Sequence, residues 1–123
     1  MVNLTIRCHP DVLFGYSNNH VELILRVENH EKHPVWVEAE ISVPQHLSLS
    51  PHNGLRKGRV RIGIVSNKEF LEKAVRVYGS SLTHSQMYKC NVILYSFNQD
   101  GVIEKRLEKT ASIRCELKKE ASI

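Results

Sequence analysis

Histidine is the residue type in this sequence that first suggests chemistry, because imidazole is the commonest side-chain ligand for metals in proteins. Only His30 and His33 lie close together, as H-x-x-H in the stretch NHEKHP, with no cysteine nearby. A zinc site needs three or four ligands at defined spacings. We therefore expect exposed loop histidines, no metal site and no cofactor. The seven histidines are His9, His20, His30, His33, His46, His52 and His84.

The stretch Asn98-Gln99-Asp100-Gly101 has part of the composition of a calcium loop. The full pattern also needs ligands at alternate positions and a later bidentate glutamate, and most of it is missing here. Asp and Gly tolerate the positive φ of a tight turn, so we predict a hairpin turn instead. The sequence also contains no recognisable Ser/His/Asp, paired-carboxylate or phosphate-loop motif. The sequence thus predicts a protein that is not an enzyme.

The three cysteines, Cys8, Cys90 and Cys115, are odd in number and form no C-x-x-C pair. Such usage is typical of a reducing compartment, where a free cysteine behaves as a small buried hydrophobe. All three fall on inferred inward faces, so we predict buried thiols that react slowly. The alternative is a Cys8–Cys115 disulfide between the first and last strands, which would need Cα atoms within about 7 Å.

Arg56, Lys57, Arg59 and Arg61 form a basic run in a chain whose formal charge is −3 over residues 1–55 and +7 over residues 56–123. Two interpretations stay open. As a stripe on one strand, the run could contact the phosphates of nucleic acid or another polyanion, although it lacks interleaved aromatic residues for stacking bases. As charges on an edge strand, it would prevent pairing with another sheet, and this is the interpretation that we favour.

Strands are the elements that must position these residues. Residues 21–29 and 35–43 alternate apolar with polar side chains, which is typical of a strand with one buried face. Turn-forming stretches separate such segments, and the sequence therefore predicts an all-β fold, an immunoglobulin-like antiparallel β-sandwich of seven to eight strands. The other alternating segments are residues 59–65, 75–78, 88–95 and 113–117, with Leu4, Ile6 and Cys8 sharing a face near the start.

Three of these segments carry more detailed expectations. In residues 59–65 the alternation assigns Val60, Ile62 and Ile64 to the inward face. Residues 88–95 become apolar on both faces, which predicts a central strand. Residues 67–77 have the i, i+4 spacing of a helix as well as a β-rich end, and we expect a strand from about Leu71, preceded by a helical turn.

The alternation places three large side chains on the outward faces of their strands, away from the predicted core. Trp36 follows the inward Val35, Ile24 lies between the inward Leu23 and Leu25, and Tyr95 falls on the odd face of its segment. Aromatic anchors outside the core are typical of interfaces. We therefore predict that Trp36, Ile24 and Tyr95 bind a protein partner or a second copy. A loop or tail folded over Trp36, or a bulge that reverses its strand, is the alternative.

The stretch Leu25–Pro44, LRVENHEKHPVWVEAEISVP, resembles the opening strands of bacterial and archaeal immunoglobulin-like domains of the CARDB and NEW3 classes. In such domains an alternating strand, an Asn-containing turn and a second alternating strand ending in Val-Pro follow one another, and the later pattern extends the resemblance over residues 20–117. It implies a non-catalytic accessory or adhesive module, often extracellular. It assigns no site residues.

Length and composition fit a single domain over residues 1–118, followed by a frayed C-terminal tail over residues 119–123. No membrane span and no signal peptide are legible, which predicts a cytoplasmic location if the chain is full length and not a domain cut from a secreted protein. The expected function is a non-enzymatic protein–protein interaction or assembly module that presents a sheet face or edge. The alternative is weak binding of nucleic acid or another polyanion through the basic C-terminal half.

Overall fold

Eight β-strands make up the fold in a computed structural model, which describes residues 1–117. No helix occurs within those residues, so the all-β prediction is confirmed. The predicted tail, residues 119–123, lies outside the described part. The strands are β1 (Val2–His9), β2 (Val12–Phe14), β3 (Asn19–Asn29), β4 (Val35–Ser42), β5 (Lys57–Val65), β6 (Phe70–Gly79), β7 (Gln86–Phe97) and β8 (Ile103–Glu116).

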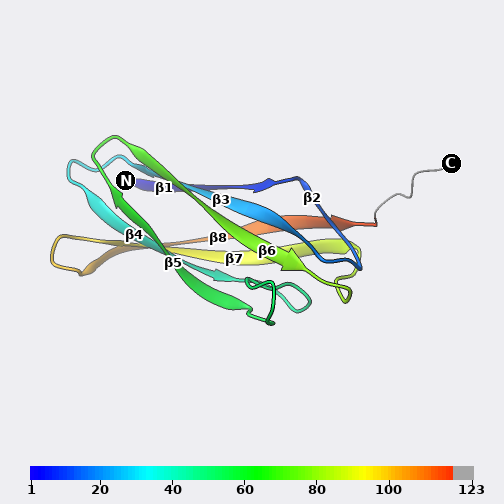
Figure 1. The fold of residues 1–123 in the computed structure, drawn as a ribbon. Coiled ribbons are helices and arrows are strands. Elements are labelled where there is room, and N and C mark those ends of the chain that lie inside the picture. The colour runs from blue at the N-terminus through cyan, green and yellow to red at the C-terminus, as the bar shows by residue number, and fades with distance from the viewer. Residues whose placement is uncertain (118–123) are drawn as a thin grey trace.

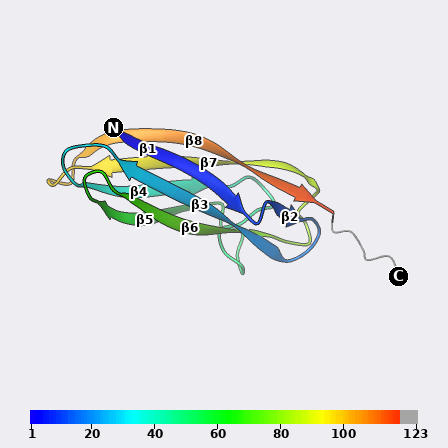
Figure 2. The same ribbon diagram turned by 90° about the horizontal axis from the view of Figure 1, so that it is seen from above.

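The strands form two sheets that lie one above the other (Figures 1 and 2). One sheet has three strands in the order β1-β3-β6, and the other has five in the order β2-β8-β7-β4-β5. The chain passes from β1 in the first sheet to β2 in the second through a cis peptide bond at His9–Pro10. There β2 runs parallel to β8, pairing with Arg114–Glu116, so one pair departs from the antiparallel arrangement that we expected.

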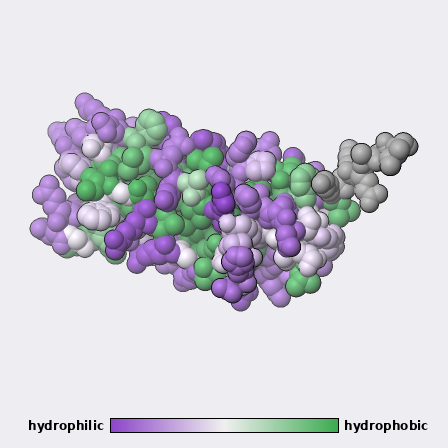
Figure 3. All heavy atoms as spheres, in the orientation of Figure 1, coloured by the Kyte–Doolittle hydropathy of each residue, from purple (hydrophilic) through white to green (hydrophobic). Residues whose placement is uncertain are grey.

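One continuous hydrophobic core lies between the sheets and takes side chains from both. Alternate residues of β3 and of β4 point into it, as their parity predicts, and burial of these aliphatic side chains is the main stabilising contribution. Figure 3 shows hydrophobic residues along the middle of the molecule, with hydrophilic residues above and below. The largest fully buried side chains include Leu4, Leu13, Leu23, Leu25, Ile41, Leu94 and Ile113.

Although β3 and β4 follow one another along the chain, they do not pair as a hairpin, because they belong to different sheets. Asn29, at the end of β3, is fully buried and stabilises the crossing. Its Nδ2 donates hydrogen bonds to the carbonyl oxygens of His33 and Val65, and its Oδ1 accepts one from the Glu31 backbone N–H. A loop crossing between layers thus replaces the tight turn of a hairpin.

Other strand predictions are confirmed. The ambiguous segment forms strand β6 as expected, but the turn before it, at residues 67–68, is not helical, since Lys68 has φ of +60°. β7 lies inside its sheet between β8 and β4, and β5 is an edge strand. The segment Asn98–Gly101 is a hairpin turn, in which Asn98 Oδ1 accepts hydrogen bonds from the N–H groups of Asp100 and Val102 and Gly101 has φ of +77°. No helix that could cross a membrane is present in residues 1–117.

Candidate functional site

A row of large apolar side chains crosses the outer face of the five-stranded sheet near one end. Register aligns Ile64 of β5 with Trp36 of β4, Trp36 with Phe97 of β7, and Phe97 with Ile103 of β8. Ile64, Trp36 and Ile103 are 57%, 46% and 53% exposed. We call these four residues the apolar row. Large side chains that are contiguous and exposed on one face mark an interaction surface more often than single ones do.

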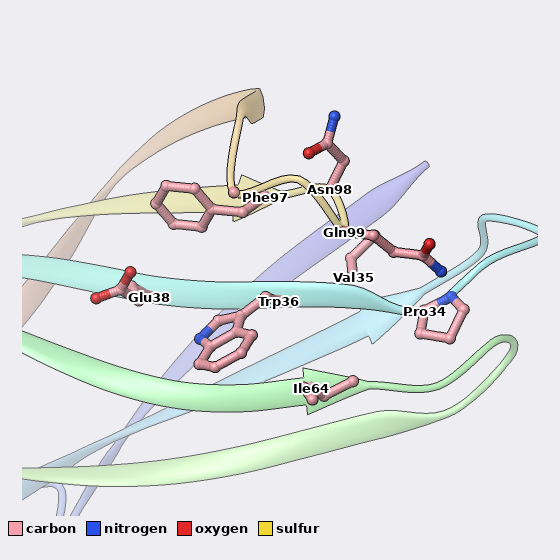
Figure 4. Close-up of a pocket in the computed structure, with 9 residues that line it drawn as sticks. Pro34, Val35, Trp36, Glu38, Ile64, Phe97, Asn98 and Gln99 are labelled. Atoms are coloured by element: carbon pink, nitrogen blue, oxygen red, sulfur yellow. The ribbon is translucent and has the colours of Figure 1, made fainter.

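A shallow hollow of about 570 Å³ lies over three members of this row, Ile64, Trp36 and Phe97. Figure 4 shows the Trp36 side chain between Ile64 of the neighbouring edge strand and Phe97 of the strand on its other side. Pro34 and Val35 add apolar wall, while Gln99 and Gly101 of the β7–β8 turn complete the rim. Glu38, two residues along β4 from Trp36, is the one charged residue that lines the hollow in the part of the chain that the structure describes.

The next row along the sheet is charged and internally paired. Register aligns Arg61, Glu38, Tyr95 and Arg106 across β5, β4, β7 and β8. The guanidinium of Arg59 lies 4.9 Å from the ring centroid of Tyr95. A side-chain hydrogen bond with Tyr95 raises the pKa of Arg106, and Glu108 adds to the effect. Tyr95 is therefore half-buried under arginine side chains.

The basic run lies where the edge-strand interpretation requires it. Lys57, Arg59 and Arg61 project from β5, the edge of the five-stranded sheet, and Arg56 directly precedes that strand. Carboxylates of β4 face two of them, since Lys57 Nζ is 3.0 Å from Glu40 and Arg61 Nε is 4.0 Å from Glu38. Much of the positive charge of this stripe is thus compensated within the sheet.

The three predicted anchors do not share one surface. Trp36 points outward, as its parity predicts, and Tyr95 lies one row away on the same sheet. Ile24 belongs to β3 of the three-stranded sheet, so its outer face is on the opposite side of the molecule. There it pairs in register with Arg7 and Ala74, and it is only partly exposed. Ile24 therefore does not belong to the surface that carries Trp36, and its contact with a partner stays a prediction.

The sequence also assigned Ile64 to the wrong face. The β4–β5 register shifts at Val37/Glu38, where Gly63 pairs with Val37 and Arg61 with Glu38, so Ile62 is an extra residue in β5. Gly63 has φ of +127°, a conformation that other residues rarely adopt. Such a bulge reverses the alternation. Ile64 therefore turns outward beside Trp36, and the isolated glycine inside an alternating strand was the available signal.

The cysteines are free thiols, and no disulfide joins Cys8 to Cys115. Cys90 and Cys115 are buried and Cys8 is half-buried. Burial raises the pKa of all three, that of Cys90 to about 12, with the nearby Cys8 adding to the shift at Cys90. A thiol that stays protonated is a poor nucleophile, so none of them is placed for catalysis.

The histidines lie at both ends of the molecule. His30 and His33 contact Glu28 and Glu104 at 3.3 and 3.5 Å. At the opposite end the rings of His46 and His84 pack edge to face, with centroids 5.2 Å apart, and Tyr16 Oη lies 3.0 Å from His84 Nδ1. No group of three or more metal-ligating side chains occurs within the described residues.

Fold and surface together define an all-β protein of two sheets, with an aromatic-centred apolar row on the outer face of the larger sheet. No family model matches the chain, and no curated protein matches it. The geometry of the row, the hollow and the charges around them is therefore the basis on which we propose a function.

Proposed function

We propose that this protein is a non-enzymatic protein–protein interaction module, and that the apolar row of Ile64, Trp36, Phe97 and Ile103 is its docking surface. The observation that carries the proposal is the row itself, which places three large side chains about half-exposed across neighbouring strands. Each Å² of apolar surface left wet costs about 25 cal/mol. A partner that covers the row would recover this free energy, with Trp36 as the anchor.

We further propose that the fold is an immunoglobulin-like β-sandwich, related to the bacterial and archaeal domains that the sequence resembles. The strand order supports this. The first strand is divided between the two sheets, with β1 in one and β2 in the other. In the first sheet β3 pairs with β6, and in the second sheet β8, β7 and β4 are neighbours. Immunoglobulin domains divide their strands in a similar way. In antibody domains a buried tryptophan lies on the third strand, strand C. The third long strand of this protein is β4, and its Trp36 points outward instead.

Polyanion binding through the basic run has weaker support. A phosphate-binding stripe presents uncompensated cations, but Glu40 lies 3.0 Å from Lys57, and Arg59 is stacked on Tyr95. Within residues 1–117, no cation–π contact covers a member of the apolar row. The docking function is therefore the better supported of the two.

Site-specific photocrosslinking tests the docking surface. A photoreactive phenylalanine analogue at Ile64, in cells that natively contain the protein, should form a discrete adduct with a partner. The same analogue at Leu82, an equally exposed apolar residue in the β6–β7 loop, is the matched control. Trp36→Ala should abolish the Ile64 adduct. An adduct that forms equally well from Leu82, or that survives Trp36→Ala, would show that the apolar row is not the docking surface.

A further inference from the structure

We infer that the partner presents a basic side chain, arginine or lysine, within an apolar segment, and that Trp36 and Glu38 together hold its cation. This inference rests on the proposed docking function and names the chemistry of the partner. It follows from three observations: the side chains that cover three other outward aromatic rings, the position of Glu38, and the lining of the hollow.

Three outward aromatic rings of the two sheets, those of Phe70, Tyr95 and Tyr78, are covered by cationic or imidazole side chains from neighbouring strands. Arg26 lies 3.7 Å from the ring centroid of Phe70, and Arg59 lies 4.9 Å from that of Tyr95. The rings of Tyr78 and His20 are 5.4 Å apart. Within residues 1–117 no such cover is found for Trp36. Indole is the strongest cation–π acceptor among side chains, so the uncovered ring is suited to a cation from outside the chain.

Glu38 supplies the charge that complements such a cation. Its side chain is only 21% exposed, and it lines the same hollow as Trp36. Its nearest basic group, Arg61 Nε, is 4.0 Å away on a side chain that is 81% exposed. By comparison, Glu40 is 3.0 Å from Lys57. The Glu38 carboxylate is thus the less compensated of the two, and an incoming ammonium or guanidinium would gain a charge-assisted contact there.

The remaining lining of the hollow suits the rest of a basic residue and its neighbours. Ile64, Phe97 and Pro34 present apolar surface to an aliphatic stem, since lysine and arginine stems pack on apolar groups while the charge stays at a polar site. Gln99 at the rim offers an amide for the backbone of an extended segment. An acidic or phosphorylated segment would instead bring like charge to Glu38. The hollow therefore discriminates in favour of basic segments.

Selection from a library of random 12-residue peptides displayed on phage tests this inference. Binders are selected on the wild-type protein and counter-selected on Trp36→Ala. We expect the enriched peptides to share an arginine or lysine flanked by apolar residues. Trp36 is the only tryptophan, so its fluorescence then measures the affinity of a synthetic enriched peptide. Replacing the basic residue by citrulline or norleucine should weaken binding about tenfold, the size of one charge-assisted contact.

Glu38→Gln should cause the same loss of about tenfold, while Glu40→Gln, on the same strand and face but outside the hollow, should leave affinity unchanged. Trp36-dependent peptides with no basic residue, or equal affinity for Glu38→Gln and wild type, would overturn the inference and leave the docking surface standing. A selection that enriches no Trp36-dependent peptide would overturn both. Dimerisation in sedimentation that Trp36→Ala abolishes would show that a second copy occupies the surface.

Discussion

Asn29 and Val65 join the two sheets: Asn29 Nδ2, at the end of β3, donates a 2.9 Å hydrogen bond to the carbonyl oxygen of Val65, at the end of β5 in the other sheet. Val65 directly follows Ile64 of the apolar row. The same amide group also holds the β3–β4 loop through His33 and Glu31. The strand end that carries Ile64 and the loop that leads to Trp36 are therefore both fixed to one buried side chain.

Asn29→Asp should lower the free energy of unfolding by about 3 kcal/mol, because a buried carboxylate cannot donate to the His33 and Val65 carbonyls and leaves them unpaired. Urea denaturation followed by circular dichroism measures the change. Asn53→Asp, in the exposed β4–β5 loop, has the same chemistry and should change stability by less than about 0.5 kcal/mol. Equal effects of the two substitutions would show that Asn29 does not join the sheets.

Trp36→Ala should lower the free energy of unfolding by less than about 1 kcal/mol, because the side chain is half-exposed and not part of the core. Leu94→Ala on the neighbouring strand β7 removes a fully buried side chain and should cost about 2–5 kcal/mol. Thermal and urea unfolding compare the two. A loss for Trp36→Ala as large as that for Leu94→Ala would mean that the indole is a structural side chain.

The double substitution Glu38→Gln/Glu40→Gln should increase retention on a heparin column, because it removes the carboxylates that compensate Arg61 and Lys57. The retention should fall steeply with salt, as expected for a contact made through ion pairing. Glu69→Gln/Asp100→Asn changes the net charge equally at exposed positions away from the stripe and should have a smaller effect. Equal retention of the two double variants would show that only net charge matters.

Stability should fall as the pH rises from about 9 to about 12, the interval between the ordinary pKa of a thiol and the raised pKa of Cys90. In this interval the unfolded chain has lost the Cys90 proton and the folded chain has kept it, so ionisation favours the unfolded state. Cys90→Ala removes this contribution and should show a shallower loss than wild type in urea midpoints measured across that range. Parallel curves would contradict the assignment.

Thr83→Val should destabilise the loop end of the molecule by about 2 kcal/mol. Thr83 is fully buried, and its Oγ1 donates to the His46 carbonyl at 2.6 Å and accepts from the Ser80 N–H at 2.8 Å. Hydrogen exchange at Ser80, together with urea unfolding, measures the loss. Thr110→Val on the exposed face of β8 should have little effect, and a comparable loss there would contradict the prediction.

Most strands could be predicted from the sequence because their alternation reflects a physical requirement, one buried and one wet face. The outward position of Trp36 followed from the same rule, since five alternate residues from Val35 to Val43 all needed burial. Which strands pair with one another in a sheet has no such local signal in the sequence. Whether β3 pairs with β4 or crosses to the other sheet depends on Asn29, which reads as an ordinary turn residue in the sequence.

The apolar row was only partly predictable for a related reason. Its members lie on four strands, and their alignment depends on register, which contacts far along the chain determine. Strict alternation along residues 59–65 assigned Ile64 to the inward face. The extra residue at the Gly63 bulge reverses the faces of the residues that follow it, and alternation alone does not reveal the bulge. Ile24 was grouped with Trp36 because parity identifies an outward side chain but not the sheet to which it belongs.

The short pairing of β2 with β8 has a consequence for how this protein behaves at high concentration. Because β2 reaches only Arg114–Glu116, residues 103–113 of β8 have no strand hydrogen-bonded on that side within the described chain. A long open edge is a template for fibril growth. Here closely spaced charges of both signs, from Glu104 to Lys109, follow that edge. We therefore expect the charged side chains of β8 to oppose edge-to-edge pairing between copies of the protein.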